Sequence, residues 1–261
     1  MRVAAVVELA CDPASVEVHP VSGAIDRTRA ALGPTPGSRE AVELALGLGE
    51  THVYGLGPAE VKDLLRECLA LGAVAAARAP DLAALAEALA AAPFDLVLVP
   101  HRSGDGAASP VAGTLAGRLD LPQATGVESL AVEDGEVRAV RRLDRAEREE
   151  LAAPLPAVIA VEPGIVRPGL ASPAALIAAR SAPVAELPAA AGAVRPMLLG
   201  HRPPRPAPPR MAAPAGELAA EARIAAVVGT AADSRQRELA TGPANHVAGR
   251  IVRLLEERGY L

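Results

Sequence analysis

The sequence predicts an α/β fold in which helices cover both faces of a parallel β-sheet. Two segments, Val3–Leu9 and Phe94–Pro100, are dominated by apolar residues, which is typical of strands that are buried on both faces. Segments with a helical spacing of apolar residues alternate with the expected strands, and this alternation indicates βαβ units. At 261 residues the chain is long enough for one large domain with an extension.

The first strand, Val3–Leu9, is followed by a segment without a sustained period. Residues Cys11–Gly37 are rich in Pro, Gly, Asp and Ser, so we expect a long loop, and loops of that length often carry function. Ser38 is a suitable N-cap for a first helix. A second strand at Thr51–Gly55 then leads into a second helix at residues 59–71.

Further elements are expected up to residue 180. In order, they are a weak strand at 73–77, helices at 82–92 and 111–119, two strands at 127–132 and 136–143, a buried strand at 155–161 and a short helix at 173–180. The two strands that flank the turn Glu133-Asp134-Gly135 are expected to form a hairpin. The predicted fold is therefore a Rossmann-like three-layer fold, with a parallel sheet, helices on both faces, an inserted β-hairpin and a C-terminal extended arm with helices.

Three segments are expected along the chain. Residues 1–182 form a nucleotide-binding-like α/β domain. Residues 183–215 are dominated by Pro, Ala and Gly, which cannot hold regular hydrogen-bonded structure, so they form a linker or an arm that lies on a partner. Residues 216–261 contain two expected helices, at 217–228 and 244–259, and form a helical segment that packs on a partner.

Composition and charge exclude several classes of function. The formal net charge of −5 argues against a general nucleic-acid binder, and an aromatic content of 1% argues against stacking on bases. The two cysteines, Cys11 and Cys68, form no CxxC pair and indicate a reducing compartment. No window reaches the ~18 apolar residues of a membrane helix, and the first apolar run meets Glu8 before it could act as a signal segment. We therefore expect a cytoplasmic protein with no nucleic-acid partner and no membrane insertion.

The polar loop His101–Gly106 follows the clearest expected strand and is the main candidate binding site. Open α/β sheets bind ligands at the carboxyl ends of their strands. Arg102 could neutralise a phosphate with help from the start of the next helix, and Asp105 or the N–H of Gly106 could meet a ribose hydroxyl. The alternative is that Asp105 only caps the turn before that helix.

Other kinds of chemistry have less support. His101, Ser103 and Asp105 could suggest a nucleophilic triad, but residues two apart on one loop rarely have the mutual geometry that a triad needs. Gly55-Leu56-Gly57 lacks the third glycine of the dinucleotide fingerprint, because Glu60 occupies its position. The histidines show no metal-binding spacing, so no metal site is expected.

A series of short motifs, in a fixed order and at near-gapless spacing, resembles one known family. The matching segments are Ser22-Gly23-Ala24-Ile25-Asp26-Arg27, Cys68–Val74, Asp95–Arg102, Leu119–Thr125, Val132–Gly135 and Ala153–Val161. Together they resemble the beta subunit of the electron transfer flavoproteins over roughly residues 1–185. The tail, with residues 229–235 and 258–261, is similar to a divergent actinobacterial branch associated with the mycofactocin redox cofactor.

The resemblance implies a heterodimer with an electron transfer flavoprotein alpha subunit. In such a pair the alpha subunit holds most of the FAD contacts, while the beta chain shields the shared flavin and docks an electron-donor dehydrogenase. The chain would then be an electron carrier rather than an enzyme on its own, which agrees with the lack of a convincing acid–base or nucleophilic set. The alternative is a stand-alone adenine-nucleotide-binding α/β protein, or a hydrolase-like enzyme that uses the loop His101–Asp105.

The family's nucleotide loop holds the phosphates of AMP or of a second flavin, and this chain departs from it. Only Asp105, Gly106 and Val111 keep the family pattern, and Pro110 lacks the backbone N–H that a phosphate cradle supplies. These departures argue against AMP, which stays an open possibility beside the shared FAD. Ser172-Pro173 stands where the family's docking loop has a leucine before proline, so an acyl-CoA dehydrogenase is not the expected donor. The candidate cofactor-binding residues are Arg102, Asp105, Gly106, Val111 and Glu8.

Overall fold

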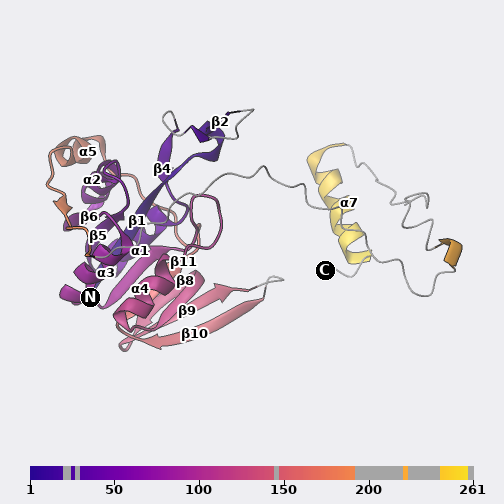
Figure 1. Ribbon diagram of the computed structural model, residues 1–261. Coiled ribbons are helices and arrows are strands. Elements are labelled where there is room, and N and C mark those ends of the chain that lie inside the picture. Colours follow the sequence, from indigo (N-terminus) through magenta and orange to yellow (C-terminus); the bar gives the residue numbers. More distant parts are fainter. Residues whose placement is uncertain (20–24, 27–29, 144–146, 192–219, 223–241, 258–261) are drawn as a thin grey trace. The chain divides into compact units, whose positions relative to one another are not determined.

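The computed structural model describes residues 1–19, 25–26, 30–143, 147–191, 220–222 and 242–257 (Figure 1). The chain divides into two compact units, Met1–Pro203 and Pro204–Leu261, and each is described by itself. The larger unit contains the β-sheet and the loop that the sequence analysis singles out, so the site is sought there.

A ten-stranded mixed sheet forms the centre of the larger unit (Figure 1). Its strands run in the order β10-β9-β8-β11-β7-β1-β5-β6-β12, and β4 is an additional strand that pairs with β1. Their bounds are β1 Arg2–Cys11, β4 Leu32–Pro34, β5 Glu50–Leu56, β6 Ala75–Ala79, β7 Leu96–Pro100, β8 Gln123–Glu133, β9 Glu136–Arg142, β10 Arg148–Pro154, β11 Ala157–Val161 and β12 Ala185–Glu186. The pairs from β8 along this order to β12 are parallel, whereas β4, β9 and β10 pair antiparallel.

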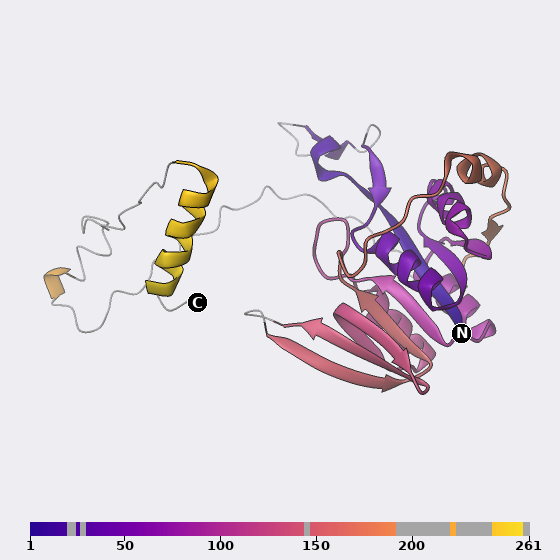
Figure 2. The same cartoon turned by 180° about the vertical axis from the view of Figure 1, so that it is seen from behind.

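Helices cover both faces of the parallel strands, and their bounds are α1 Ser38–Leu48, α2 Val61–Leu71, α3 Leu82–Ala91 and α4 Val111–Leu119. Alternate residues of β1 point to opposite faces. Val3, Ala5 and Val7 pack in a core with α1 and α2, whereas Ala4 and Val6 pack in a second core with α3 and α4. Figure 2 shows the same layers from behind. The predicted three-layer α/β fold is confirmed, with a mixed rather than a purely parallel sheet.

The start of α1 differs from the prediction. Gly37, not Ser38, is the N-cap residue, with a φ of 92°, and a Cβ at this position would lie 3.0 Å from the carbonyl oxygen of Val161. The buried Ser38 hydroxyl instead accepts a hydrogen bond from the backbone N–H of Glu8 at 3.2 Å and lies 2.8 Å from Thr35 Oγ1. Ser38 therefore ties the helix to the carboxyl end of β1 and does not cap it.

The predicted hairpin is confirmed, and a third strand extends it. β8 and β9 pair antiparallel on either side of a turn with positive φ at Asp134 and Gly135. β10 adds to β9, and Arg141 Nε donates to Glu149 Oε2 at 2.5 Å between these two strands. The sequence does not reveal β10, because its charged residues resemble a solvated end of the hairpin.

Short strands also lie within the segment Cys11–Gly37, which was expected to be a loop. A 3-10 turn at Pro13–Ser15 precedes β2 (Glu17–Val18), which pairs with β3 (Ile25–Asp26). β4 pairs with the end of β1, from Leu9 to Cys11. β4 thus pairs with residues of β1 that lie beyond those paired with β5 and β7, and β2 and β4 lie above the carboxyl edge of the sheet (Figure 1).

The segments expected at 183–215 and 216–261 are described only in part, and the three predicted boundaries stay a prediction. β12 pairs with β6 and so adds residues beyond 182 to the sheet. A short helix, α5 (Pro173–Ala179), precedes it, with Ser172 as its N-cap. In the smaller unit α7 spans Ala244–Glu257. Apart from residues 220–222, the expected helix at 217–228 lies outside the described residues, as do 22–24, 229–235 and 258–261. Among the helices described, none has the length and apolar character to cross a membrane.

Candidate functional site

The order of the strands places a switch point between β1 and β7. After β1 the chain forms β5 and β6 on one side of it, and then crosses to form β7 on the other side. Ligands of open α/β sheets bind outside the carboxyl ends of the strands at such a point. Glu8 of β1 and the loop that follows β7 both lie at this edge. The predicted position of the loop at the carboxyl edge of the sheet is therefore consistent with the topology, and Glu8 lies at the same edge.

Three titratable side chains follow buried strand residues at this edge. Glu8 lies on β1, three residues beyond Ala5, where the described pairing of β1 with β7 ends. Val161 pairs with Pro100, so continuing this register brings Glu162 beside His101. The backbone N–H of His101 donates to the carbonyl of Val161 at 2.9 Å, which supports this continuation. By strand alternation, Glu8, His101 and Glu162 all face the side that α3 and α4 cover.

Glu8 is a half-buried carboxyl group without a partner for one of its oxygens. Its Oε1 atom is buried and has no hydrogen-bond partner in the described part of the chain. Removal from water disfavours the charged form, and burial raises the pKa of Glu8 to about 7. The backbone of Glu8 is fully engaged, because its N–H donates to Ser38 and its carbonyl accepts from Thr35 N at 2.9 Å. The backbone of Glu8 is thus fixed, whereas Oε1 of its side-chain carboxyl group lacks a hydrogen-bond partner among the described residues.

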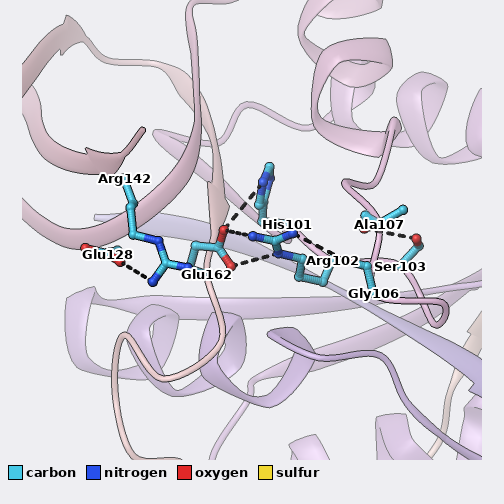
Figure 3. Close-up of polar contacts among 8 residues, drawn as sticks. All are labelled: His101, Arg102, Ser103, Gly106, Ala107, Glu128, Arg142 and Glu162. Atoms are coloured by element: carbon cyan, nitrogen blue, oxygen red, sulfur yellow. Dashed lines mark hydrogen bonds and ion pairs between the residues drawn. The ribbon is translucent and has the colours of Figure 1, made fainter. Parts of the chain in front are cut away.

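Glu162 holds the guanidinium group of Arg102 in a bidentate ion pair (Figure 3). Arg102 Nε donates to Glu162 Oε2 at 3.0 Å and Nη2 donates to Oε1 at 2.6 Å. Burial alone raises the pKa of Glu162, but the hydrogen bonds from Arg102 and the nearby positive charges outweigh it and lower this pKa overall. The same hydrogen bonds raise the pKa of Arg102. The sequence analysis proposed that Arg102 neutralises a phosphate; in the structure Glu162 holds two of its N–H donors, so a phosphate would have to share the guanidinium group with this carboxylate.

His101 completes this cluster as a neutral group. Its Nε2 lies 3.6 Å from Glu162 Oε1, and its buried Nδ1 has no hydrogen-bond partner among the described residues. Burial lowers the pKa of His101, and the Glu162 carboxylate opposes this without reversing it. At neutral pH the loop cation is therefore Arg102, and Glu162 already holds it.

A second carboxylate connects the base of the hairpin to this cluster. Glu128 of β8 accepts from Arg142 Nη1 at 3.3 Å and from Arg148 Nε at 3.1 Å, and Figure 3 shows the pair with Arg142 beside Glu162. The positive charge of Arg142 also contributes to the lowered pKa of Glu162. The antiparallel strands β8, β9 and β10 thus interact electrostatically with the edge of the sheet through Arg142.

The loop after β7 is a turn that satisfies its own polar groups. Asp105 Oδ1 accepts from Ser103 Oγ at 2.5 Å and from the N–H of Ala107 at 3.0 Å. The hydrogen bond from Ser103, then that from Ala107, lowers the pKa of Asp105. The carbonyl of Gly106, whose φ is 81°, accepts from Arg102 Nη1 at 3.3 Å. Asp105 therefore caps the turn, as the alternative interpretation of the sequence proposed, while its exposed position leaves a ligand contact untested.

The nucleophilic triad that the sequence could suggest does not assemble. Ser103 Oγ donates to Asp105 and to the carbonyl of Ala107, whereas His101 points to Glu162 (Figure 3). A nucleophilic serine needs a hydrogen bond to its general base. Within the described ranges no such bond joins Ser103 to His101, so the hydrolase-like alternative gains no support.

The start of α4 offers little to a phosphate. Pro110 is the N-cap residue and has no N–H, and the N–H of Val111 donates to Ser109 Oγ at 3.3 Å. The side chain of Val111 is buried in the core beneath α4. The donors that normally make a helix N-terminus an anion site are thus partly missing and partly taken. Tested against these residues, the phosphate groups of AMP or FAD do not fit this edge.

Glu162 is the site residue that the sequence analysis missed. It follows the buried strand β11 directly, just as His101 follows β7. The rule that polar residues at the carboxyl ends of parallel strands gather at one edge would have identified it. Its partner could not have been identified, because Arg102 lies 60 positions away.

Gly104 fixes how closely the loop approaches β1. A Cβ at Gly104 would overlap the Cβ of Ala10, whereas a Cβ at Gly33 would meet nothing within 4 Å. We expect Gly104→Ala to displace the loop and to lower the free energy of unfolding by about 1–3 kcal/mol, with Gly33→Ala as the matched control. Denaturant unfolding measures both. Equal stability of the two variants would contradict the tight contact between the loop and β1.

Fold and topology together define an α/β protein with a switch point between β1 and β7, at whose carboxyl edge Glu162 holds Arg102. The electron transfer flavoprotein domain family matches residues 22–192. The match covers more than half of the chain, so the chain belongs to the electron transfer flavoprotein domain family. This confirms the resemblance found in the sequence motifs.

Curated relatives agree with the beta-subunit resemblance. The chain is 29% identical over 162 residues to the Caffeyl-CoA reductase-Etf complex subunit CarD of Acetobacterium woodii, covering 55% of this chain and 62% of the relative. It is 29% identical over 147 residues to the electron transfer flavoprotein subunit beta of Clostridium acetobutylicum, covering 50% and 56%. It is 31% identical over 151 residues to the subunit beta of Methylophilus methylotrophus, covering 53% and 57%. The chain thus spans less than two thirds of the length of these relatives.

Proposed function

We propose that the chain is the beta-type subunit of an electron transfer flavoprotein and works as a heterodimer with an alpha-type subunit. The structural observation behind this proposal is that, in the described part of the chain, Glu162 holds Arg102 and Asp105 holds Ser103, so these groups form no acid–base or nucleophilic set. Electron transfer requires a positioned cofactor rather than catalytic side chains. Family membership and the beta-subunit relatives support the same function.

FAD is the proposed cofactor, shared with the alpha subunit and held mainly by it. The edge residues proposed to lie nearest to the ligand are Glu8, Arg102, Asp105, Gly106 and Val111. Since this edge offers few donors to a diphosphate, this chain would cover the flavin by complementary shape and would not bind its diphosphate group. An electron-donor dehydrogenase is the proposed further partner, and the chain is proposed to belong to the mycofactocin-associated branch of the family.

Co-purification tests the proposed partnership. The chain carrying an affinity tag is co-expressed with an alpha-type subunit, and the eluate is analysed by size-exclusion chromatography. We expect a one-to-one complex, whereas the chain expressed alone is expected to be poorly soluble or colourless. A stable isolated chain that does not bind the alpha-type subunit would contradict the proposal.

A further inference from the structure

The feature that carries a further inference is the mismatch between the switch-point edge and an anionic ligand. A nucleotide phosphate needs a free cation or several free N–H donors. Arg102 is the cation nearest to the loop turn, and both of its donor positions toward Glu162 are occupied at 2.6 and 3.0 Å. Its remaining described contact, from Nη1, is to the carbonyl of Gly106.

Two carboxyl groups lie at the edge where a phosphate would bind. Glu162 lies beside His101 in the register of β11 and β7, and Glu8 lies at the same edge on β1. The Glu162 side chain is only 13% exposed, so water screens its charge poorly. Neutral His101 supplies no compensating charge. A dianionic phosphate would therefore meet acceptors and like charge where it needs donors.

The helix that follows the loop does not compensate. Pro110 lacks an N–H, and the N–H of Val111 is bonded to Ser109. The turn itself uses the N–H of Ala107 for Asp105 and that of Gly106 for the carbonyl of Ser103. The backbone donors described between Ser103 and Val111 are thus largely engaged within the loop.

We propose that Glu8 and Glu162 make the switch-point edge of this chain reject phosphate, so that the chain does not retain AMP. Glu162 does so by holding Arg102, and Glu8 does so by placing a second carboxyl group beside the loop. An uncharged group that donates hydrogen bonds, such as a nucleoside, suits this edge better than a nucleotide, because the buried Oε1 of Glu8 lacks a donor. This inference deepens the proposed function, since it concerns the ligand of the same site.

The test compares AMP with adenosine. Calorimetric titration is carried out on the co-purified heterodimer, or on the isolated chain if no heterodimer forms. Failure to form the heterodimer would count against the proposed function, whereas the AMP and adenosine affinities test the present inference. We expect the purified protein to release no AMP on denaturation and to bind AMP no more tightly than adenosine. Stoichiometric AMP in the extract, or AMP that binds tenfold more tightly than adenosine, would overturn the proposal.

Variants identify the residues responsible. Glu162→Gln removes the charge that holds Arg102, and Glu8→Gln removes the second carboxyl group. Each is expected to strengthen AMP binding roughly tenfold or more, the effect of one charge-assisted hydrogen bond, and Glu162→Gln is expected to leave adenosine binding unchanged. Glu87→Gln, on the exposed surface of α3, makes the same change of charge elsewhere and should leave AMP binding as it is. If neither edge variant differs from Glu87→Gln, the assignment to Glu8 and Glu162 fails.

Discussion

Replacing Glu8 with Gln is expected to stabilise the protein at pH 8 by up to about 3 kcal/mol. The pKa of Glu8 is raised by burial from its ordinary 4.5 to about 7, and each unit corresponds to about 1.4 kcal/mol. Between pH 4.5 and 7 the folded chain keeps the proton that the unfolded chain has lost. The stability contributed by this group therefore falls as the pH rises through this window, and the full penalty is present above pH 7.

Thermal unfolding of the wild type and of Glu8→Gln between pH 5 and pH 8 measures this effect. The melting temperature of the wild type should fall relative to that of the variant as the pH rises, and the two should converge at the acid end. Glu87→Gln serves as the control, because it removes a carboxylate from an exposed position on α3. A difference between Glu8→Gln and wild type that does not change with pH would show that burial of the charge is not its cause.

Replacing Arg102 with Ala is expected to lower the free energy of unfolding by about 1.5–3 kcal/mol, because it leaves Glu162 with no bidentate partner. Arg102 is itself one-third exposed, with a side-chain accessibility of 33%, so the effect should lie toward the lower figure. Arg102→Lys should recover only part of the loss, since an ammonium group cannot reproduce two parallel N–H···O bonds.

A double-mutant cycle separates the ion pair from other effects of the substitution. Glu162→Gln in the background of Arg102→Ala removes the charge that the single variant leaves unpaired, so much of the lost stability should return. In this account Arg102→Ala releases no nucleotide, because the guanidinium group contacts a carboxylate rather than a phosphate. If the costs of the two single substitutions simply add, the ion pair between Arg102 and Glu162 does not act as a unit.

The sequence predicts the fold well where the period of apolar residues is clear. β1 and β7 are apolar on both faces, and helix α4 has the predicted bounds Val111–Leu119. β10 has no such signal, because three consecutive charged residues precede its apolar ones, and its identity as a strand depends on pairing with β9. Ser38 has the residue type of an N-cap, but tertiary contact with the end of β1 determines its role instead.

The position of the candidate residues at one edge of the sheet can be predicted from the sequence, but their ion pairs cannot. The topological rule for parallel sheets places Glu8 and the loop after β7 at one edge. The rule says nothing of which charges pair, and Arg102 is bound to a carboxylate 60 positions away in sequence. Asp105 shows the opposite case, since a turn-capping role for aspartate is local and can be predicted from the sequence.

The flavin content of the complex tests the central claim most directly. The chain is co-purified with an alpha-type subunit, its visible spectrum is recorded, and the flavin released on denaturation is counted against the amount of protein. The account predicts a yellow one-to-one complex that releases one FAD and no second flavin, since the edge at Arg102 and Glu162 does not fit a diphosphate. Two flavins per complex, or a colourless complex, would contradict it.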